Sequence, residues 1–267
     1  MSAQLLQGKH AVVFGAGGSV GAAAAKEFAA EGAEVFLAGR TRSSVEDVAQ
    51  HIRRAGGLAQ AAVIDALDDT SVNDYVNGIA SQVGKIDIEF NAVGPLAHEY
   101  GNTKHATDLA IAEFMLPLTT VVKSQFITAR AAARHMVKQR SGVIIFLTGS
   151  PARGHVEGAT AIGTAFGAIE SLTENLAIEV SPSGVRVVCL RTTANVDSRS
   201  IQQTMDALAS KVNITKDQAI AGVASLNFLK VPASVSDTAK AAVLIASDRA
   251  RLLTGTVVNS TAGAALD

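Results

Sequence analysis

The chain lacks several features that would assign it to a specialised class of protein. Its 267 residues contain one cysteine, Cys189, which excludes an internal disulfide framework or a zinc site built from cysteines and suits a reducing cytosol. Residues 1–8 lack the basic and then apolar pattern of a signal peptide, and the apolar runs are well short of the roughly 20 residues that a membrane-spanning helix needs. The 23 basic and 24 acidic residues nearly balance, which does not favour nucleic acid or an anionic membrane as a partner. We therefore expect a cytoplasmic protein without a membrane or nucleic-acid partner.

What the chain has is apolar material in a regular order. Hydrophobic residues make up 48% and charged residues 18%, enough to bury both faces of a sheet. Short apolar runs alternate with longer segments whose apolar residues are three and four apart, which is the pattern of strands alternating with helices. The expected strands are Ala11–Phe14, Glu34–Ala38, Ala61–Ile64, Ile86–Asn91, Val143–Leu147, Val185–Leu190 and Thr256–Asn259. The expected helices include Val20–Glu31, Ser43–Ala55, Val72–Val83, Phe126–Gln139 and Ala168–Val180.

This alternation predicts an α/β fold. Repeated strand–helix–strand units form right-handed crossovers and a parallel sheet with helices on both faces. We predict one Rossmann-like, doubly wound domain over residues 1–267, with about seven strands. A polar, helical-looking segment at about residues 195–230 interrupts the alternation. It is either a surface excursion or a substrate lid, and its position near the carboxyl ends of the strands favours a lid.

A glycine-rich turn follows the first expected strand and precedes an alanine-rich helix. Glycine lets the backbone turn tightly and approach a pyrophosphate, and the helix then offers free N–H groups and a partial positive charge to the phosphates. An ordinary tight turn is the less favoured alternative. The turn and the helix start predict cofactor contacts from Gly15, Gly17, Gly18, Ser19, Val20 and Gly21.

The end of the second expected strand favours NADP(H) over NAD(H). An NAD-binding protein would place an acid here for the ribose hydroxyls. This chain has Arg40, Thr41 and Arg42 instead, and a guanidinium group matches the 2′-phosphate of NADP, which an acid would repel. The alternative is a solvated arginine pair at the start of the next helix.

With these motifs in place, the chain resembles the short-chain dehydrogenase/reductase family over nearly its whole length. The glycine turn is similar to the family's T-G-x-x-x-G-x-G, with Phe14 and Ser19 at the first threonine and the middle glycine. Asn91-Ala92-Val93-Gly94 resembles the family's N-N-A-G. The resemblance implies further cofactor contacts from Asp65, Ala66, Asn91, Ala92 and Val93, and from Thr192 and Thr193 in place of a Pro-Gly beside the nicotinamide.

The resemblance fails at the catalytic positions. The family usually uses a tyrosine, a lysine four residues later, a serine and an asparagine. Counting back from the turn Ser181–Gly184 brings the tyrosine and lysine positions to Ile162 and Phe166, which cannot exchange protons. The serine position falls at Gly149 or Ser150, and the asparagine position falls near Val121.

Ser150 and His155 are the candidates to act in place of the missing groups. A histidine titrates near neutral pH, although an exposed loop histidine is the more common situation. Arg191, at the end of a buried strand, needs either an ion-pair partner or an anionic ligand. His98 and Tyr100 either line the opposite wall or lie elsewhere on the surface. We expect no metal ion.

Two functions remain open. The first is an NADP(H)-dependent oxidoreductase with a non-standard active site that reduces a C=C, C=N or unusual carbonyl bond of a small molecule. The second is a catalytically inactive NADP-binding sensor or an assembly partner of an active relative. In either case the family resemblance implies a homotetramer or homodimer.

Overall fold

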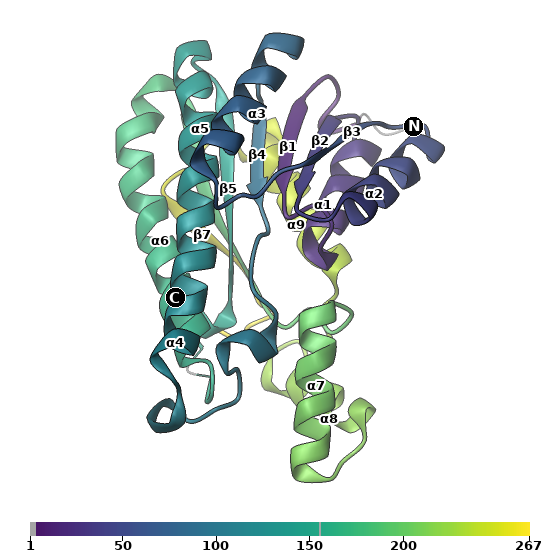
Figure 1. Ribbon diagram of the computed structural model, residues 1–267, viewed down its shortest axis with the longest axis vertical. Coiled ribbons are helices and arrows are strands. Elements are labelled where there is room, and N and C mark those ends of the chain that lie inside the picture. Colours follow the sequence, from purple (N-terminus) through teal and green to yellow (C-terminus); the bar gives the residue numbers. More distant parts are fainter. Residues whose placement is uncertain (1–3, 155) are drawn as a thin grey trace.

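The computed structural model describes residues 4–154 and 156–267, and these form a seven-stranded parallel sheet with helices on both faces (Figure 1). The strand order β3-β2-β1-β4-β5-β6-β7 reverses between β1 and β4, as in a doubly wound sheet. The predicted α/β fold and its strand number are confirmed. The strands are β1 (His10–Phe14), β2 (Glu34–Gly39), β3 (Leu58–Val63), β4 (Ile88–Asn91), β5 (Gly142–Gly149), β6 (Val185–Thr192) and β7 (Thr256–Ser260).

The apolar runs form strands because the middle of the sheet is covered on both faces. Phe146 on β5 belongs to one core cluster, while its neighbour Ile145 belongs to the other. Successive side chains of a strand point to opposite faces, so a strand with two covered faces needs apolar residues at every position. The pairing of β5 with β6 runs from Gly142 opposite Val185 to Gly149 opposite Thr192.

Two layers of helices build these two cores. Helices α1 (Ser19–Ala30), α2 (Arg42–Arg54) and α9 (Val235–Ala246) cover one face, and α3 (Asp69–Val83), α5 (Lys123–Gln139) and α6 (Thr160–Val180) cover the other (Figure 1). Aromatic pairs fix both contacts, with Phe28 edge-on to Phe90 in the first core and Phe14 edge-on to Tyr75 in the second. The strand ends above these cores are therefore held on rigid elements.

Several boundaries differ from the sequence-based expectation. Helix α6 begins at Thr160 rather than Ala168. Its first two turns contain Gly163 and Gly167, which interrupt the apolar spacing on which the sequence-based boundary rested. Strand β3 spans Leu58–Val63 rather than residues 61–64. A short helix α4 (Ile111–Pro117) continues through a π-helical turn, Leu118–Val122, directly into α5. The apolar periodicity of the sequence did not indicate this π-helical turn. π-Helical turns often occur at functional sites.

Residues 195–230 contain two helices, α7 (Arg199–Val212) and α8 (Lys216–Leu226), which project beyond the end of the sheet (Figure 1). Each begins at a hydrogen-bonded cap, since Ser198 and Thr215 accept backbone N–H groups. The two helices have a small apolar cluster of their own around Met205, Ala209 and Ala219. No helix in the described part of the chain is both long and apolar enough to cross a membrane.

Candidate active site

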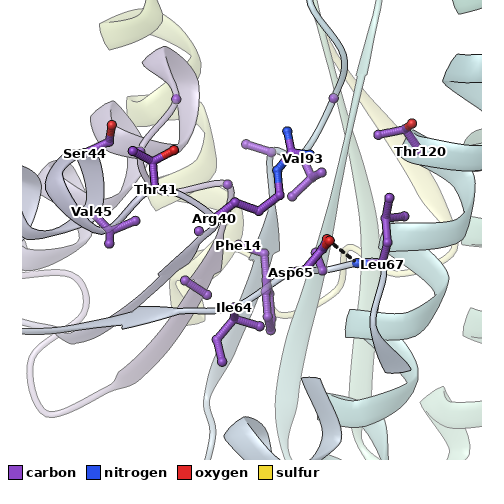
Figure 2. A pocket seen from close by; sticks show the side chains of 18 of the residues that line it. Phe14, Arg40, Thr41, Ser44, Val45, Ile64, Asp65, Leu67, Val93 and Thr120 are labelled. Carbon is purple, nitrogen blue, oxygen red and sulfur yellow. Dashed lines mark hydrogen bonds between the residues drawn. The ribbon is translucent and has the colours of Figure 1, made fainter. Parts of the chain in front are cut away.

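The carboxyl ends of β1, β2, β3 and β4 surround a cavity of about 280 Å³ (Figure 2). Ligands of open α/β sheets bind at this edge, next to the point where the strand order reverses. The cavity therefore lies where the sequence predicted a dinucleotide. The predicted residues that line it are Gly15, Gly17, Gly18, Arg40, Thr41, Asp65, Ala66, Ala92 and Val93.

The glycine turn packs closely against neighbouring backbone at Gly15 and at Gly21. Gly15 has a φ of +72°, and a Cβ there would lie 2.8 Å from the carbonyl carbon of Ala92 after β4. A Cβ on Gly21 would lie 2.3 Å from the carbonyl oxygen of Gly15. Residues with side chains do not fit at these positions, and the backbone is left open to the cavity. The N-terminus of α1 has no side-chain cap, so its N–H groups remain available to an anion.

Arg40 brings a positive charge to the end of β2. Figure 2 shows its side chain extending across the cavity towards Val93. Residues 4–154 and 156–267 contain no carboxylate within ion-pair distance of it. Ser44, one turn into α2, lines the cavity beside Thr41. A guanidinium group with two hydroxyls beside it is a suitable environment for a phosphate.

Two predicted residues hold turns in place. Asp65 lines the cavity and accepts the backbone N–H of Leu67 at 3.0 Å (Figure 2). Asn91 is fully buried below the cavity, where its side-chain oxygen accepts the N–H of Val93 at 2.8 Å and its amide donates to Thr128 at 2.9 Å. Asn91 thus fixes the turn after β4 from within the core.

The other predicted cofactor residues are not part of the cavity wall. Ser19 is engaged by the backbone N–H of Arg199 at 3.1 Å, and Thr192 is buried and bonded to the hydroxyl of Thr238 at 2.7 Å. Arg42 is exposed at the start of α2. The predicted residues absent from the cavity wall are Ser19, Val20, Gly21, Arg42, Asn91, Thr192 and Thr193.

The catalytic positions of the resemblance meet in an apolar cluster. Val121 and Ile162 are buried in the core between the sheet and α5 and α6, and the partly buried Phe166 packs against that core. At the end of β5, a Cβ on Gly149 would lie 2.9 Å from Cε2 of Phe166. The aromatic ring thus occupies the space that a serine at Gly149 would require.

The remaining candidate proton donors are few. Ser150 is buried in the short helical turn after β5, while His155 lies outside the described residues. Burial raises the pKa of Tyr100 to about 12 and that of Cys189 to about 12. Burial also raises the pKa of Tyr75. Tyr100 packs into the core and His98 is exposed, so neither matches the wall residue that the sequence allowed.

Arg191 takes part in a buried network of ion pairs. Its Nε donates to Glu170 Oε1 at 2.7 Å and its terminal nitrogens bind Glu170 Oε2 and Asp267, while Arg153 donates to Glu170 Oε2 at 3.2 Å. Arg191 and Glu170 are 1% and 2% exposed. Of the two alternatives for Arg191, the structure shows the ion-pair partner.

Some residues of the cavity wall have no local signal in the sequence. Arg199, from α7, and Thr120, from the π-helical turn, reach the cavity only because the chain folds back over the strand ends. Glu99 and Leu96 follow β4 in an irregular segment, where no periodic pattern marks a side chain as inward-facing. These contributions depend on tertiary structure, which a local pattern does not encode.

Comparisons with known proteins agree with this architecture. Residues 9–220 match the family described as short chain dehydrogenase. The 7alpha-hydroxysteroid dehydrogenase of Clostridium sardiniense is 29% identical over 266 residues, which are 98% of this chain and 95% of that protein. The short-chain reductase protein NovJ of Streptomyces niveus is 30% identical over 259 residues, which are 95% of this chain and 92% of that protein. A solved 7α-hydroxysteroid dehydrogenase complexed with NADH and 7-oxo glycochenodeoxycholic acid superposes with a TM-score of 0.83 and 26% identity, covering 100% of this chain and 98% of that one.

Proposed function

The chain belongs to the short-chain dehydrogenase/reductase family of oxidoreductases, and from this premise we propose an NADP(H)-dependent enzyme with a non-standard active site. The main observation in favour of this function is the cavity that the glycine turn and Arg40 line at neighbouring strand ends. NADP(H) would supply hydride transfer, and the protein would bind and orient the reactants.

The cavity wall supports the choice of NADP(H). The glycine turn and the uncapped start of α1 suit the pyrophosphate, Asp65 suits the adenine end, and Arg40 with Thr41 suits a 2′-phosphate. The residues present therefore fit the cofactor. The seven predicted residues outside the cavity wall would support the turns or contact the nicotinamide end.

The proposed substrate contains a C=C, a C=N or an unusual carbonyl bond. Ile162 and Val121 are buried and Phe166 is partly buried, so this region is apolar where the family's usual site has polar groups. Reduction of such a bond does not need a tyrosine beside a carbonyl oxygen, because water, a hydroxyl or an imidazole can deliver the proton. Ser150 and His155 are the proposed donors, and residues 195–230 are the proposed lid.

A catalytically inactive NADP-binding sensor or assembly partner is the second candidate. The observation that favours it is the packing of Ile162 and Phe166 into a continuous core cluster, which is the usual role of apolar residues at helical spacing. Both candidates need the cofactor site, so they differ only in turnover.

Cofactor preference is tested by titrating the wild type and Arg40→Ala with NADPH and NADH. We expect the wild type to prefer NADPH, and Arg40→Ala to lose about 10- to 100-fold in NADPH affinity with little change for NADH, as for a charge-assisted hydrogen bond worth about 1.5–3 kcal/mol. Arg54→Ala, which removes an exposed arginine at the other end of α2, is the matched control. A wild-type preference for NADH would contradict the NADP(H) assignment.

Turnover is tested by NADPH oxidation with a panel of ketones, enones and imines. Consumption with enones or imines supports the enzyme, whereas tight NADPH binding without turnover of any substrate supports the sensor. No binding of either cofactor would contradict both candidates.

We also propose a cytoplasmic homotetramer, with a homodimer as the alternative. The outer sides of α5 and α6 expose apolar residues, including Phe126 at 44% and Ile178 at 77%, as helices between a sheet and a partner subunit do. Light scattering at micromolar concentration measures the assembly, and a monomer would contradict it.

A further inference from the structure

A hydrogen bond joins α7 directly to the glycine turn. The backbone N–H of Arg199 donates to the hydroxyl of Ser19 at 3.1 Å, which links the first residue of α7 to the first residue of α1. Ser19 stands where the motif that the turn resembles has its middle glycine, and a glycine would offer no acceptor side chain. The hydroxyl that departs from the motif thus contributes a hydrogen bond to the start of α7, beside the one that Asn102 donates to Thr204.

Arg199, an exposed residue at the start of α7, lines the same cavity as the turn. Arg199 lines the cavity together with Gly17 and Gly18, and it has no ion-pair partner within residues 4–154 and 156–267. Glu99 is an acid in this wall, but its carboxylate accepts the backbone N–H of Leu96. A guanidinium group therefore lies at the cavity without a protein anion bound to it.

Two positive features consequently line one small volume. The uncapped N-terminus of α1 carries a partial positive charge, and Arg199 adds a full positive charge to the lining of the same cavity. Positive groups that line one cavity are stabilised by an anion placed between them, and a guanidinium group forms paired hydrogen bonds with phosphate oxygens. In the dinucleotide that we propose for this cavity, the group next to a glycine turn is the pyrophosphate.

We propose that Arg199 binds the pyrophosphate of the cofactor and that this contact, together with the Ser19 hydrogen bond, fastens α7 over the loaded site. The inference rests on the proposed binding of a nicotinamide dinucleotide. It gives the two arginines of the cavity separate tasks: Arg40 recognises the 2′-phosphate, which only NADP(H) has, and Arg199 recognises the pyrophosphate, which NADP(H) and NAD(H) share. Because the pyrophosphate contact and the Ser19 hydrogen bond both need α7 in the position that it has here, a bound cofactor would stabilise α7 in that position.

The test measures both binding and the position of α7. NADPH and NADH are titrated into the wild type, Arg199→Ala, Arg199→Lys and Lys211→Ala. Lys211 is exposed at the other end of α7, so its removal takes the same charge from the same helix away from the cavity. Amide hydrogen exchange of residues 199–212 is followed with and without NADPH in each variant and in Ser19→Ala.

We expect Arg199→Ala to weaken NADPH and NADH by a similar factor of about 10 to 100. Arg199→Lys should fall between Arg199→Ala and the wild type, because it keeps the charge but loses the paired geometry. NADPH should slow the exchange of α7 amides in the wild type and in Lys211→Ala, and less so in Arg199→Ala and Ser19→Ala.

Four outcomes would overturn the inference, the last of them being wild-type cofactor binding that Arg199→Ala leaves unchanged. Equal losses in Arg199→Ala and Lys211→Ala would show a general charge effect, and a loss confined to NADPH would place Arg199 at the 2′-phosphate. Cofactor protection of α7 that persists in Arg199→Ala would show that the arginine does not fasten the helix. If the wild type binds neither cofactor, the proposed function itself fails, which is a different result from wild-type binding that Arg199→Ala leaves unchanged.

Discussion

The two halves of the strand-end edge differ in what they offer to a ligand. Around β1 to β4, glycines lie where a Cβ would collide with neighbouring backbone, and a cavity is open between the strand ends. Around β5 and β6, we predict that Val121, Ile162 and Phe166 occupy the positions of the family's polar groups, and all three belong to or pack against one apolar cluster. The first half has a shape that suits a dinucleotide, and the second half is apolar.

Two of these predicted positions lie close together. The serine position falls at Gly149 or Ser150, and the ring of Phe166, at the predicted lysine position, occupies the volume that a side chain on Gly149 would need. Changing either residue alone would leave a cavity or a clash, and either would cost stability. A side chain at residue 149 and an aromatic ring at residue 166 therefore exclude each other in this packing.

The first prediction concerns the double substitution that restores a tyrosine at residue 162 and a lysine at residue 166. It would produce the largest change in rate if these two groups were all that the site lacks. We expect Ile162→Tyr/Phe166→Lys to remain without ketone reductase activity, although a positioned acid is worth roughly 10²–10⁴-fold in rate. The new ammonium would enter an apolar cluster, where burial lowers its pKa, and Val121 offers no group to hold a relay water. The measurement is NADPH oxidation with a ketone panel, and unchanged NADPH affinity is the control. A gain of 100-fold or more would show that two residues alone account for the lost chemistry.

The sequence predicted the first half better than the second, for a physical reason. Each of the seven apolar runs forms a strand, and glycines at a strand–helix junction specify a tight turn. The strands and the turn could therefore be predicted from short stretches of sequence. The early start of α6 was missed because Gly163 and Gly167 interrupt its apolar spacing, while packing keeps it helical. Arg199 was missed because its place depends on how residues 195–230 fold back.

The next comparison concerns two buried glutamates, one in each half. Glu170 is paired with Arg191, and we expect Glu170→Gln to lower the free energy of unfolding by about 3–5 kcal/mol, because it leaves a buried guanidinium group without its carboxylate. Urea unfolding at pH 7 measures the loss. Glu174→Gln, an exposed position on the same helix, should change stability by less than about 0.5 kcal/mol. A small effect at Glu170 would show that Asp267 alone suffices for Arg191.

Glu89, on β4 below the cofactor turn, presents the opposite case. It is fully buried, its carboxylate oxygens have no hydrogen-bond partner among the described residues, and burial raises its pKa from 4.5 to about 8. Between these pH values the unfolded chain releases this proton and the folded chain keeps it, so stability falls as pH rises.

Glu89→Leu should therefore stabilise the protein by about 2–4 kcal/mol more at pH 8 than at pH 5. The free energies of unfolding of both proteins across this range measure the difference. Glu89→Gln, which cannot ionise, should remove the same pH dependence without adding apolar contact. A parallel pH profile for wild type and Glu89→Leu would mean that Glu89 is solvated or paired in solution.

The smallest effect tests the coordination of Gly149 with Phe166. Gly149 has a φ of −137°, which any residue adopts, so Gly149→Ser should be costly only because its Cβ meets the ring of Phe166. We expect a loss of about 1–3 kcal/mol in the wild type and a much smaller loss in a Phe166→Ala background, which gives a coupling energy of about 1–2 kcal/mol. Gly167→Ala, on the same helix with no atom within 4 Å of the added Cβ, should instead stabilise by about 0.5–1 kcal/mol. Strict additivity of the stability changes of Gly149→Ser and Phe166→Ala would show that the ring of Phe166 does not hinder a side chain at residue 149.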